Sequence, residues 1–316
     1  MLSLNMQELH RKIVIIYNPA AGKGKGLKYA TKLAAELGRL GIEIAQVFRS
    51  DSLEAMREFH AANTGNKHSF SLAVLIGGDG TIGPNVDAMI KCGADVPIYP
   101  FGRGTANDFS SALKTNVSVR KVAKIIAEGS ILEVDTLKTE APGNVLGVNY
   151  AVNNAAGGAF TNGVTNYKGK KVFGKLAYIV TAALHALRMK AQKMRFTVDG
   201  ESFEETVFLF YILNTKNAGG IKGAGSKASP SDGLLDLVCI RKCGLWGKLC
   251  VGLSALCGCI HKSKRVKYIQ GKTFRAEVVG SRIHNFTKTD TDGNPGGDYP
   301  LEVQVGPKIQ VVCRKI

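Results

Sequence analysis

Three glycines surround one carboxylate in the stretch from Ile76 to Thr81, and this pattern could serve phosphate chemistry. The stretch reads Ile-Gly-Gly-Asp-Gly-Thr and follows an apolar run that begins at Leu72. Glycines let the backbone approach a ligand closely and expose N–H groups that bind phosphate oxygens. A carboxylate repels phosphates unless it holds a magnesium ion or accepts a proton from a nucleophile, so Asp79 indicates phosphoryl transfer. The alternative is a tight turn after a buried strand, since glycine clusters occur in many folds.

Two other apolar runs end in glycine-rich polar loops of the same kind. Residues 13–17 lead into a loop at residues 18–26, and residues 97–99 lead into a loop at residues 100–109. Open α/β sheets bind ligands at the carboxyl ends of neighbouring parallel strands, so the three loops are expected to converge on one crevice. None of them has the spacing of a Walker P-loop or of a dinucleotide-binding fingerprint.

These motifs resemble those of the diacylglycerol kinase catalytic-domain family, which includes bacterial lipid kinases and the sphingosine and ceramide kinases. The matching pieces occur in the family's order and cover nearly the whole chain. They are Asn18-Pro19 with Gly22, the motif at residues 77–81, Gly-Thr-Ala-Asn-Asp-Phe at 104–109, Asp-Gly-Leu-Leu-Asp at 232–236 and Asp292-Gly293. NAD kinases and phosphofructokinases share the Gly-Gly-Asp-Gly element, so it is the combination with residues 104–109 that indicates this family.

The resemblance implies an ATP- and magnesium-dependent kinase that transfers the γ-phosphoryl group to a lipid hydroxyl, with diacylglycerol as the default acceptor. It implies nucleotide binding by Asn18, Pro19, Gly22, Lys23, Ser50, Gly77, Gly78, Asp79, Gly80, Thr81, Gly104, Thr105, Asn107 and Asp108. It also implies that Asp232 and the main-chain carbonyls of Leu235 and Leu237 bind a structural magnesium ion, for which oxygen ligands are suitable. Lys23 or Lys25 is expected to neutralise the phosphates.

The expected catalytic positions are Asp79, Asp292 and residue 294. Family members usually have Asp-Gly-Glu in the late motif, and in bacterial relatives that Glu is assigned as the proton acceptor, whereas this chain has Asn294. An amide does not accept a proton at neutral pH, so either a carboxylate at Asp79 or Asp292 is the base or activity is impaired. Relatives usually have Asn-Glu after the threonine of the first motif, and Gly-Pro-Asn at residues 83–85 puts the acceptor contacts in doubt.

Two other functions remain open at this point. A kinase of a soluble acceptor such as NAD would use the same Asp79 motif but would not explain residues 104–109. A nucleotide- or lipid-binding protein with weak catalysis would explain Asn294. Phosphate transfer from labelled ATP to a panel of lipids, compared with transfer to NAD, would separate the three functions.

The net charge of +17 and the pI near 9.6 predict an anionic partner. Lysines and arginines are spread along the chain without a nucleic-acid-binding motif, so we expect no nucleic acid and favour a nucleotide and an anionic membrane surface. The seven cysteines predict reduced thiols, and Cys-Gly-Cys-Ile-His at residues 257–261 is too sparse to predict a metal site. Residues 1–12 lack the apolar core of a secretory signal. The expected location is cytoplasmic, peripheral at the inner face of the membrane, and a homodimer remains open.

A length of 316 residues and a hydrophobic content of 45% predict two domains. Residues 1–129 are expected to form an α/β nucleotide-binding domain with a parallel sheet, similar to NAD kinases and phosphofructokinases. Its strands are predicted at 13–17, 43–48, 71–76 and 97–99, and its helices at 27–40, from 51 onward, at 85–91, after 107 and at 119–128. Residues 130–316 are expected to form a mostly antiparallel β lipid-acceptor domain, whose last strands could pack back on the first domain. Its strands are predicted at 132–138, 145–153, 195–198, 205–214, 234–240, 273–279 and 301–312.

Two helices are expected to interrupt the second domain, at residues 172–190 and 245–260. The apolar core of each has only about a dozen residues, which is too short to span a bilayer. Cations flank both helices at Lys168, Lys170, Lys171, Lys175, Arg188, Lys190, Lys193, His261, Lys262, Lys264 and Arg265. The pattern predicts either an interfacial membrane contact or helices that pack on the β-domain with solvated lysines at their ends.

Overall fold

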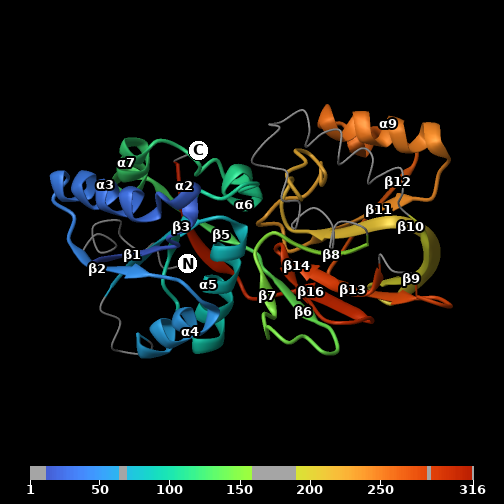
Figure 1. The fold of residues 1–316 in the computed structure, drawn as a ribbon, viewed down its shortest axis with the longest axis horizontal. Coiled ribbons are helices and arrows are strands. Elements are labelled where there is room, and N and C mark those ends of the chain that lie inside the picture. The colour runs from blue at the N-terminus through green and yellow to red at the C-terminus, as the bar shows by residue number, and fades with distance from the viewer. Residues whose placement is uncertain (1–11, 64–69, 159–189, 283–285, 315–316) are drawn as a thin grey trace. The chain divides into compact units, whose positions relative to one another are not determined.

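The computed structural model describes residues 12–63, 70–158, 190–282 and 286–314, and the chain divides into two compact units (Figure 1). The first unit comprises Met1–Thr136, Tyr150–Val152 and Gly306–Ile316, and the second comprises Leu137–Asn149 and Asn153–Val305. The chain therefore passes between the units four times, which differs from the single boundary that we predicted between residues 129 and 130.

The first unit is built on a six-stranded sheet with the order β2-β1-β3-β4-β17-β5. Its strands are β1 (Ile13–Tyr17), β2 (Ile44–Arg49), β3 (Leu72–Gly77), β4 (Ile98–Gly102), β5 (Ser130–Val134) and β17 (Ile309–Cys313). β1, β2, β3 and β4 pair in parallel, and β17 pairs in parallel with β4 and antiparallel with β5. β1 and β3 are continuous apolar runs and are fully buried, as parallel strands covered on both faces must be. The predicted α/β class with a parallel sheet is confirmed.

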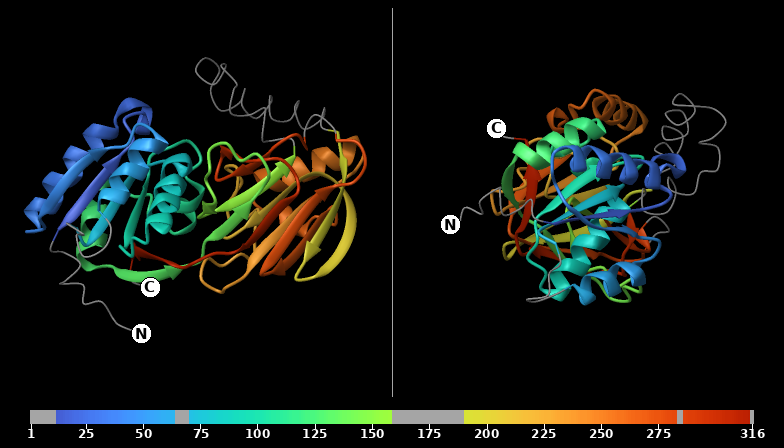
Figure 2. Two further views of the ribbon diagram at one scale, coloured as in Figure 1. Left: turned by 90° about the horizontal axis from the view of Figure 1, so that it is seen from below. Right: turned by 90° about the vertical axis from the view of Figure 1, so that its left-hand side faces the viewer.

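Helices cover both faces of this sheet (Figures 1 and 2). They are α2 (Ala21–Gly24), α3 (Gly26–Arg39), α4 (Leu53–Ala62), α5 (Asp79–Cys92), α6 (Asp108–Ala112) and α7 (Val119–Glu128). On one face, Leu33 and Leu37 of α3 pack in one core cluster with Ile126 of α7. On the other face, Phe59 of α4 and Met89 of α5 belong to a second cluster. The predicted helices at 27–40 and 119–128 agree with α3 and α7 within one residue at each end.

The helix that we predicted at residues 85–91 begins six residues earlier, at Asp79. Gly78 is its N-cap in an extended conformation, and the carbonyl of Gly78 accepts the N–H groups of Thr81 and Ile82 at 2.9 and 3.0 Å. The glycine motif is therefore the first turn of α5 rather than a loop before it, and Pro84 lies inside the helix. At α4 the N-cap is Ser52, whose hydroxyl accepts the N–H of Ala55 at 3.1 Å.

The second unit is an antiparallel sheet with the strand order β15-β14-β8-β10-β9-β13-β16-β6, in which β11 pairs with β10 and with β12. Its strands are β6 (Leu137–Glu140), β8 (Asn154–Gly158), β9 (Gln192–Val198), β10 (Glu201–Leu213), β11 (Leu235–Arg241), β12 (Val266–Gly271), β13 (Thr273–Val278), β14 (Thr289–Thr291), β15 (Asn294–Pro295) and β16 (Leu301–Val305). β7 (Tyr150–Ala151) belongs to the first unit by its residues. The predicted antiparallel class of the second domain is confirmed, although β8, β12, β14 and β15 were missed.

Two predicted strands are each broken into two. The strand at 132–138 divides around Asp135 and Thr136 into β5 and β6, and the strand at 301–312 divides around Gly306 and Pro307 into β16 and β17. The two breaks are bonded to each other, because Gly306 N donates to Thr136 O at 2.7 Å and Thr136 Oγ1 donates to Pro307 O at 2.6 Å. β5 and β17 then complete the first sheet. Of the strand predicted at 145–153, only the short β7 forms, and β8 begins just beyond the predicted range.

The second unit also contains α9 (Leu245–Leu256) and the 3₁₀ turn η3 (Ile260–Lys262). The helix predicted at 245–260 ends early because Gly258 adopts a left-handed conformation with φ of 66°. The helix predicted at 172–190, with its cations from Lys168 to Arg188, lies outside the described residues except for Lys190. Among the helices that the structure describes, none is long and apolar enough to cross a bilayer.

Candidate functional site

Three loops meet at the carboxyl ends of β1, β3 and β4, as the order of these adjacent parallel strands requires. Main-chain hydrogen bonds join the loops directly. Asn18 N donates to Ile76 O at 3.0 Å, Gly22 N donates to Arg103 O at 2.6 Å, and Arg103 N donates to Gly77 O at 2.6 Å. The bonds tie the first and third loops to the end of β3 and to each other, so the three glycine-rich segments are held together in the first unit.

Asp79 is the first residue of α5, and its carboxylate connects that helix to α6. Oδ2 accepts the N–H of Asp108 and Oδ1 accepts the N–H of Phe109, both at 3.1 Å. Burial raises the pKa of Asp79, and these N–H groups partly oppose the rise. Each carboxylate oxygen carries a second lone pair, so the two bonds leave Asp79 able to accept a proton or to bind a cation.

Gly78 and Gly104 bring the backbones of two loops into direct contact. A Cβ atom on Gly104 would lie 2.5 Å from the Cα of Gly78, and a Cβ on Gly78 would lie 2.9 Å from the Cα of Gly104. Asn107, in a left-handed conformation with φ of 54°, closes the turn around Gly104. Its Oδ1 accepts the N–H of Gly104 at 2.6 Å, and its Nδ2 donates to the Gly104 carbonyl at 3.0 Å. Only glycine fits at either contact.

Asn18 and Thr81 link the first loop to α5. Asn18 Nδ2 donates to Thr81 Oγ1 at 3.1 Å, and Asn18 Oδ1 accepts the N–H of Ala20 at 2.8 Å. Ser50, at the end of β2, is bound to the same sheet edge because its N–H donates to Tyr17 O at 2.9 Å. Its buried hydroxyl has no hydrogen-bond partner among the described residues.

The remaining sequence-predicted nucleotide contacts lie on the same three loops. Lys23, Gly80 and Thr105 are exposed, whereas Pro19 and Gly22 are partly buried. Lys23 has a left-handed backbone with φ of 61° and follows Gly22 with φ of 59°. All the predicted nucleotide-binding residues therefore belong to the first unit and surround the junction of the loops.

Arg103 is a residue that the sequence analysis missed. Its guanidinium donates to Asn116 Oδ1 and to Val117 O at 2.6 Å each, and it lies 3.9 Å from the ring centroid of Phe101. Burial lowers the pKa of Arg103. Because its donors are directed into the protein, Arg103 supports the loop from beneath rather than offering a charge to phosphate. Its position between two glycines of the third loop was the available signal.

In the second unit, Asp292 and Gly293 form the two-residue turn between β14 and β15. Both have positive φ, 50° and 80°, which is typical of tight hairpin turns. The buried carboxylate of Asp292 accepts the N–H groups of Asn153 and Asn154 through Oδ1, at 3.0 and 2.8 Å. Asn294 opens β15, and its Nδ2 donates to Thr291 O at 3.3 Å. Asp292 therefore fixes the hairpin to the start of β8.

The predicted magnesium ligands lie at the start of β11. Asp232 precedes the strand, and its Oδ1 accepts the N–H of Leu234 at 3.1 Å. Leu235 and Leu237 are strand residues paired with β12. Asp236 between them is fully buried, and the side chains of Tyr268 and Gln270 on β12 lie close enough to hydrogen-bond to its carboxylate. Burial raises the pKa of Asp236, and the nearby Asp232 carboxylate raises it further.

A hard cation would offset the negative charge of the buried Asp236 and of the nearby Asp232, so these residues fit the expected metal, with Asp236 as an addition to the predicted set. The described residues contain no cluster of three or more His, Cys, Asp or Glu side chains that could hold a metal ion. A cation at β11 would consequently depend on main-chain oxygens as well as on carboxylates.

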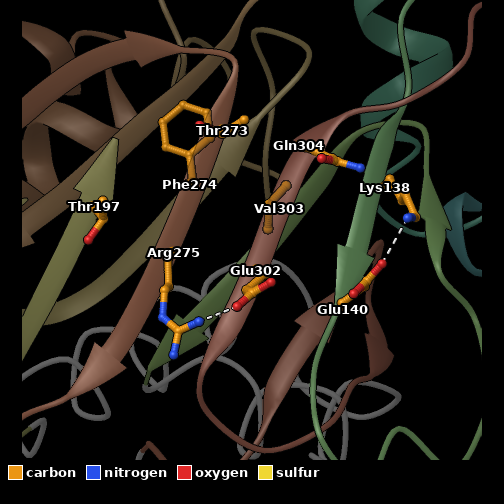
Figure 3. Close-up of a pocket in the computed structure, with 9 residues that line it drawn as sticks. All are labelled: Lys138, Glu140, Thr197, Thr273, Phe274, Arg275, Glu302, Val303 and Gln304. Carbon is orange, nitrogen blue, oxygen red and sulfur yellow. Dashed lines mark hydrogen bonds and ion pairs between the residues drawn. The ribbon is translucent and has the colours of Figure 1, made fainter. Parts of the chain in front are cut away.

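A separate depression on the sheet of the second unit is lined by side chains of β6, β9, β13 and β16 (Figure 3). Its charged groups form ion pairs with one another. Lys138 lies 2.8 Å from Glu140, and Arg275 pairs with Glu302 and, at 2.9 Å, with Glu277. Because none of the predicted site residues lines this depression and its charges are paired, we do not assign the site there.

Two family models match the chain, one in each half. The model described as diacylglycerol kinase catalytic domain matches residues 12–139, and the model described as YegS C-terminal NAD kinase beta sandwich-like domain matches residues 151–314. The second match alone covers more than half of the chain. The chain belongs to the diacylglycerol kinase catalytic-domain family. The predicted family is confirmed.

Relatives within this family match over nearly their full length. The chain is 27% identical over 305 residues to a diacylglycerol kinase of Bacillus subtilis strain 168, covering 95% of this chain and 96% of that relative. It is 24% identical over 294 residues to a diacylglycerol kinase of Staphylococcus carnosus strain TM300, covering 92% and 91%. The crystal structure of a diacylglycerol kinase from Bacillus anthracis has the same fold, with a TM-score of 0.75, 18% identity, and coverage of 96% and 97%.

Asp290 is a further carboxylate on the late hairpin, and the sequence analysis did not single it out. It lies in β14, two residues before Asp292, and its Oδ1 accepts the N–H of Gly293 at 2.9 Å. Burial raises the pKa of Asp290 from its ordinary 3.8 to about 6. The folded protein therefore favours protonated Asp290, and this contribution to stability is present below pH 3.8 and is lost as the pH rises through 6.

Asp290→Asn should consequently increase the free energy of unfolding at pH 7.5 by up to about 3 kcal/mol, because the amide carries no charge to desolvate. Asparagine can keep the Oδ1 contact to Gly293. Urea unfolding of both proteins at pH 4 and pH 7.5 measures the effect, which should be small at pH 4. If the stability difference between the two proteins did not change with pH, it would not come from the ionisation of Asp290.

Proposed function

We propose that the chain is an ATP- and magnesium-dependent lipid kinase that transfers the γ-phosphoryl group of ATP to a lipid hydroxyl, with diacylglycerol as the acceptor. The observation that carries the proposal is the junction of three glycine-rich loops around Asp79 in the first unit. Family membership and the diacylglycerol kinases among its relatives support a lipid kinase in general.

The phosphates of ATP would bind at the amino terminus of α5, where the first-turn N–H groups and the helix dipole favour negative charge. Gly78 and Gly80 leave that turn open to a close approach. Lys23 is exposed on the adjoining loop and would offset phosphate charge, and the buried Ser50 hydroxyl could donate a hydrogen bond. Magnesium, when bound, would spread the charge that develops on the transferred phosphoryl group.

We assign the role of proton acceptor to Asp79 rather than to Asp292. The acceptor hydroxyl attacks the γ-phosphorus as the bond to the ADP oxygen breaks, and its proton passes to a carboxylate. Burial raises the pKa of Asp79, which makes its carboxylate a stronger base. Asp79 lies at the loop junction that would bind the phosphates, whereas Asp292 lies in the second unit and holds the β14–β15 hairpin to the start of β8. Asn294 has no basic group, so it would contribute a polar contact only.

Transfer of labelled phosphate from ATP to a panel of lipids, with NAD as the soluble alternative, tests the proposal. Diacylglycerol should be the best acceptor, and chelation of magnesium should abolish transfer. Labelling of NAD instead of any lipid would identify a kinase of a soluble acceptor. ATP binding without transfer to any acceptor would identify a binding protein with weak catalysis, and Asn294 is the observation that favours this second candidate.

Because the proposed acceptor is a membrane lipid, we expect the kinase to act in the cytoplasm, at the anionic inner face of the membrane. The net charge of +17 supports such a partner. A homodimer stays a prediction that sedimentation of the purified chain would test.

Gly104→Ala should lower the affinity for ATP by about 5- to 150-fold, because overpacking of this kind costs about 1–3 kcal/mol. The added Cβ would lie 2.5 Å from the backbone of Gly78 and would force the loops apart. The matched control is Gly38→Ala in α3, where a Cβ meets no atom within 4 Å. That change should raise the thermal stability and leave ATP affinity unaltered. Equal ATP affinity of the two variants would argue against a phosphate site between the loops.

A further inference from the structure

Helix α9 carries an apolar stripe on its solvent-facing side. Leu245, Leu249 and Leu253 follow one another at intervals of four residues, and Trp246 lies beside them on the same face. Their exposed fractions are 59%, 38%, 63% and 79%. Large apolar side chains are normally buried, so four of them together on one helix face indicate a surface that is covered in use.

The opposite face of α9 anchors the helix to its own unit (Figure 1). Val251 is buried in a core cluster with Phe208, Ile240 and Ile260, and Ala255 packs against the same cluster. The helix is therefore apolar on two sides, one of which already has its partner. The exposed stripe is not required to hold α9 in place, because Val251 and its neighbours do so.

The chain around α9 is exclusively basic. Residues 241–272 contain eight lysines and arginines and no aspartate or glutamate, namely Arg241, Lys242, Lys248, Lys262, Lys264, Arg265, Lys267 and Lys272. Lys242, Lys262, Lys264 and Arg265 are exposed, and none of these four forms an ion pair within the described part of the chain. The Arg265 side chain lies against α9, since a Cβ on Gly247 would be 2.7 Å from Arg265 Nε. Arg265 therefore lies beside the helix that carries the apolar stripe, and Lys242, Lys262 and Lys264 lie close to that helix in the sequence.

We propose that α9 docks on the surface of an anionic phospholipid bilayer. The side chains of Leu245, Trp246, Leu249 and Leu253 enter the boundary between headgroups and acyl chains, and the nearby cations contact lipid phosphates. The stripe offers one polar group, the indole N–H, whereas protein interfaces generally need about one hydrogen bond per 100–200 Å². An aromatic residue with one polar group suits the membrane interface. The role of this docking rests on the proposed function, since docking would bring a lipid kinase to its acceptor.

Trp246 is the only tryptophan of the chain, so its fluorescence reports on this helix alone. The full chain is mixed with vesicles of phosphatidylcholine and phosphatidylglycerol whose acyl chains carry bromine, a quencher of tryptophan emission. We expect a blue shift and quenching that increase with the phosphatidylglycerol fraction and weaken with added salt, which screens charges beyond about 8 Å at physiological ionic strength. Sedimentation with the vesicles while the emission stays unchanged would show that another surface binds lipid, and would overturn the proposal.

Two variants separate the stripe from general lipid binding. Leu253→Glu should weaken vesicle binding by at least about tenfold, because a charge replaces an inserted apolar group. Leu40→Glu is the matched control, since Leu40 is 52% exposed in the first unit and should bind vesicles as the unaltered chain does. Combined replacement of Lys262, Lys264 and Arg265 by alanine should cost about fivefold for each cation at low salt. Equal binding by Leu253→Glu and Leu40→Glu would contradict the proposal.

Transfer to a short-chain diacylglycerol dissolved as monomers separates the docking surface from the kinase function. Leu253→Glu should keep this activity and lose activity on the same lipid class in vesicles. If the chain phosphorylates no lipid at all, the proposed function fails while the fluorescence test still decides whether α9 enters the bilayer. A blue shift of Trp246 that depends on protein concentration without vesicles would reveal self-association through α9, and would overturn docking on lipid.

Discussion

Replacing Asp79 with asparagine should lower turnover by about 10²- to 10⁴-fold, the contribution of a well-placed proton acceptor. The amide keeps the size of the carboxylate but neither carries charge for a cation nor accepts a proton. The two carboxylate oxygens of Asp79 accept the N–H groups of Asp108 and Phe109 at 3.1 Å. In the asparagine variant an NH₂ group replaces one of these oxygens and faces one of these N–H donors. An unsatisfied donor of this kind should reduce the free energy of unfolding by about 1–3 kcal/mol.

Asp87→Asn separates the chemical loss from the structural one. Asp87 belongs to the same helix and is buried, and its carboxylate accepts the N–H of Tyr150 and pairs with Lys91, both at 3.0 Å. Removing its charge should therefore cost a similar amount of stability. Asp87 has no proposed role in phosphoryl transfer, so turnover of this variant at a temperature where it is folded should stay within a few-fold of the unaltered chain. Equal losses of turnover in both variants would assign Asp79 a structural role only.

The junction of loops could be predicted from the sequence because its signals are local. Apolar runs such as residues 72–76 are too continuous for half-exposed strands, and each ends in glycines, so a parallel sheet with loops at one edge follows from the pattern alone. The start of α5 was misplaced for an equally local reason. Pro84 is a common first-turn residue and suggested a late start, whereas the helix begins where Gly78 caps it.

Features that depend on distant contacts could not be predicted. The strand breaks at Thr136 and Gly306 are 170 residues apart in the sequence, and a hydrogen bond joins them. Neither break could be predicted without knowing that the other lies beside it. Arg103 was missed because its hydrogen-bond acceptors, Asn116 and Val117, come after a helix and a turn. The glycine motif alone does not predict where that segment runs. The raised pKa of Asp290 likewise comes from burial by strands that pair in three dimensions.

For the helix at residues 245–260 the sequence predicted two alternatives, and the structure of α9 has one side that packs on its own unit and one side that is exposed. Its apolar positions suggested either packing on the β-domain or contact with a membrane interface. Val251 packs on the β-domain, while Leu253 and Trp246 remain exposed. A helix with two apolar faces has little net asymmetry, so the pattern alone could not assign its sides.

Asn294→Glu should raise turnover by about 10²- to 10⁴-fold if the late hairpin places residue 294 as its relatives do, because a carboxylate there gains the capacity to accept the hydroxyl proton. The hairpin can accommodate the change. Asn294 is only partly buried, and its one side-chain bond, to Thr291 O, is long at 3.3 Å. Asp292 and Gly293 fix the turn through their own positive φ values and not through this side chain.

Asn294→Gln is the matched control, since it has the length of glutamate without the charge. Turnover of the glutamine variant should stay near that of the unaltered chain, so the difference between Glu and Gln isolates proton acceptance. Electrostatics work in the opposite direction, because Asp290 and Asp292 already lie on this hairpin and a third carboxylate would add to its negative charge. ATP affinity must therefore be measured separately from turnover. A glutamate variant with unchanged ATP affinity and no gain over glutamine would show that position 294 takes no part in proton transfer in this chain, leaving Asp79 as the base.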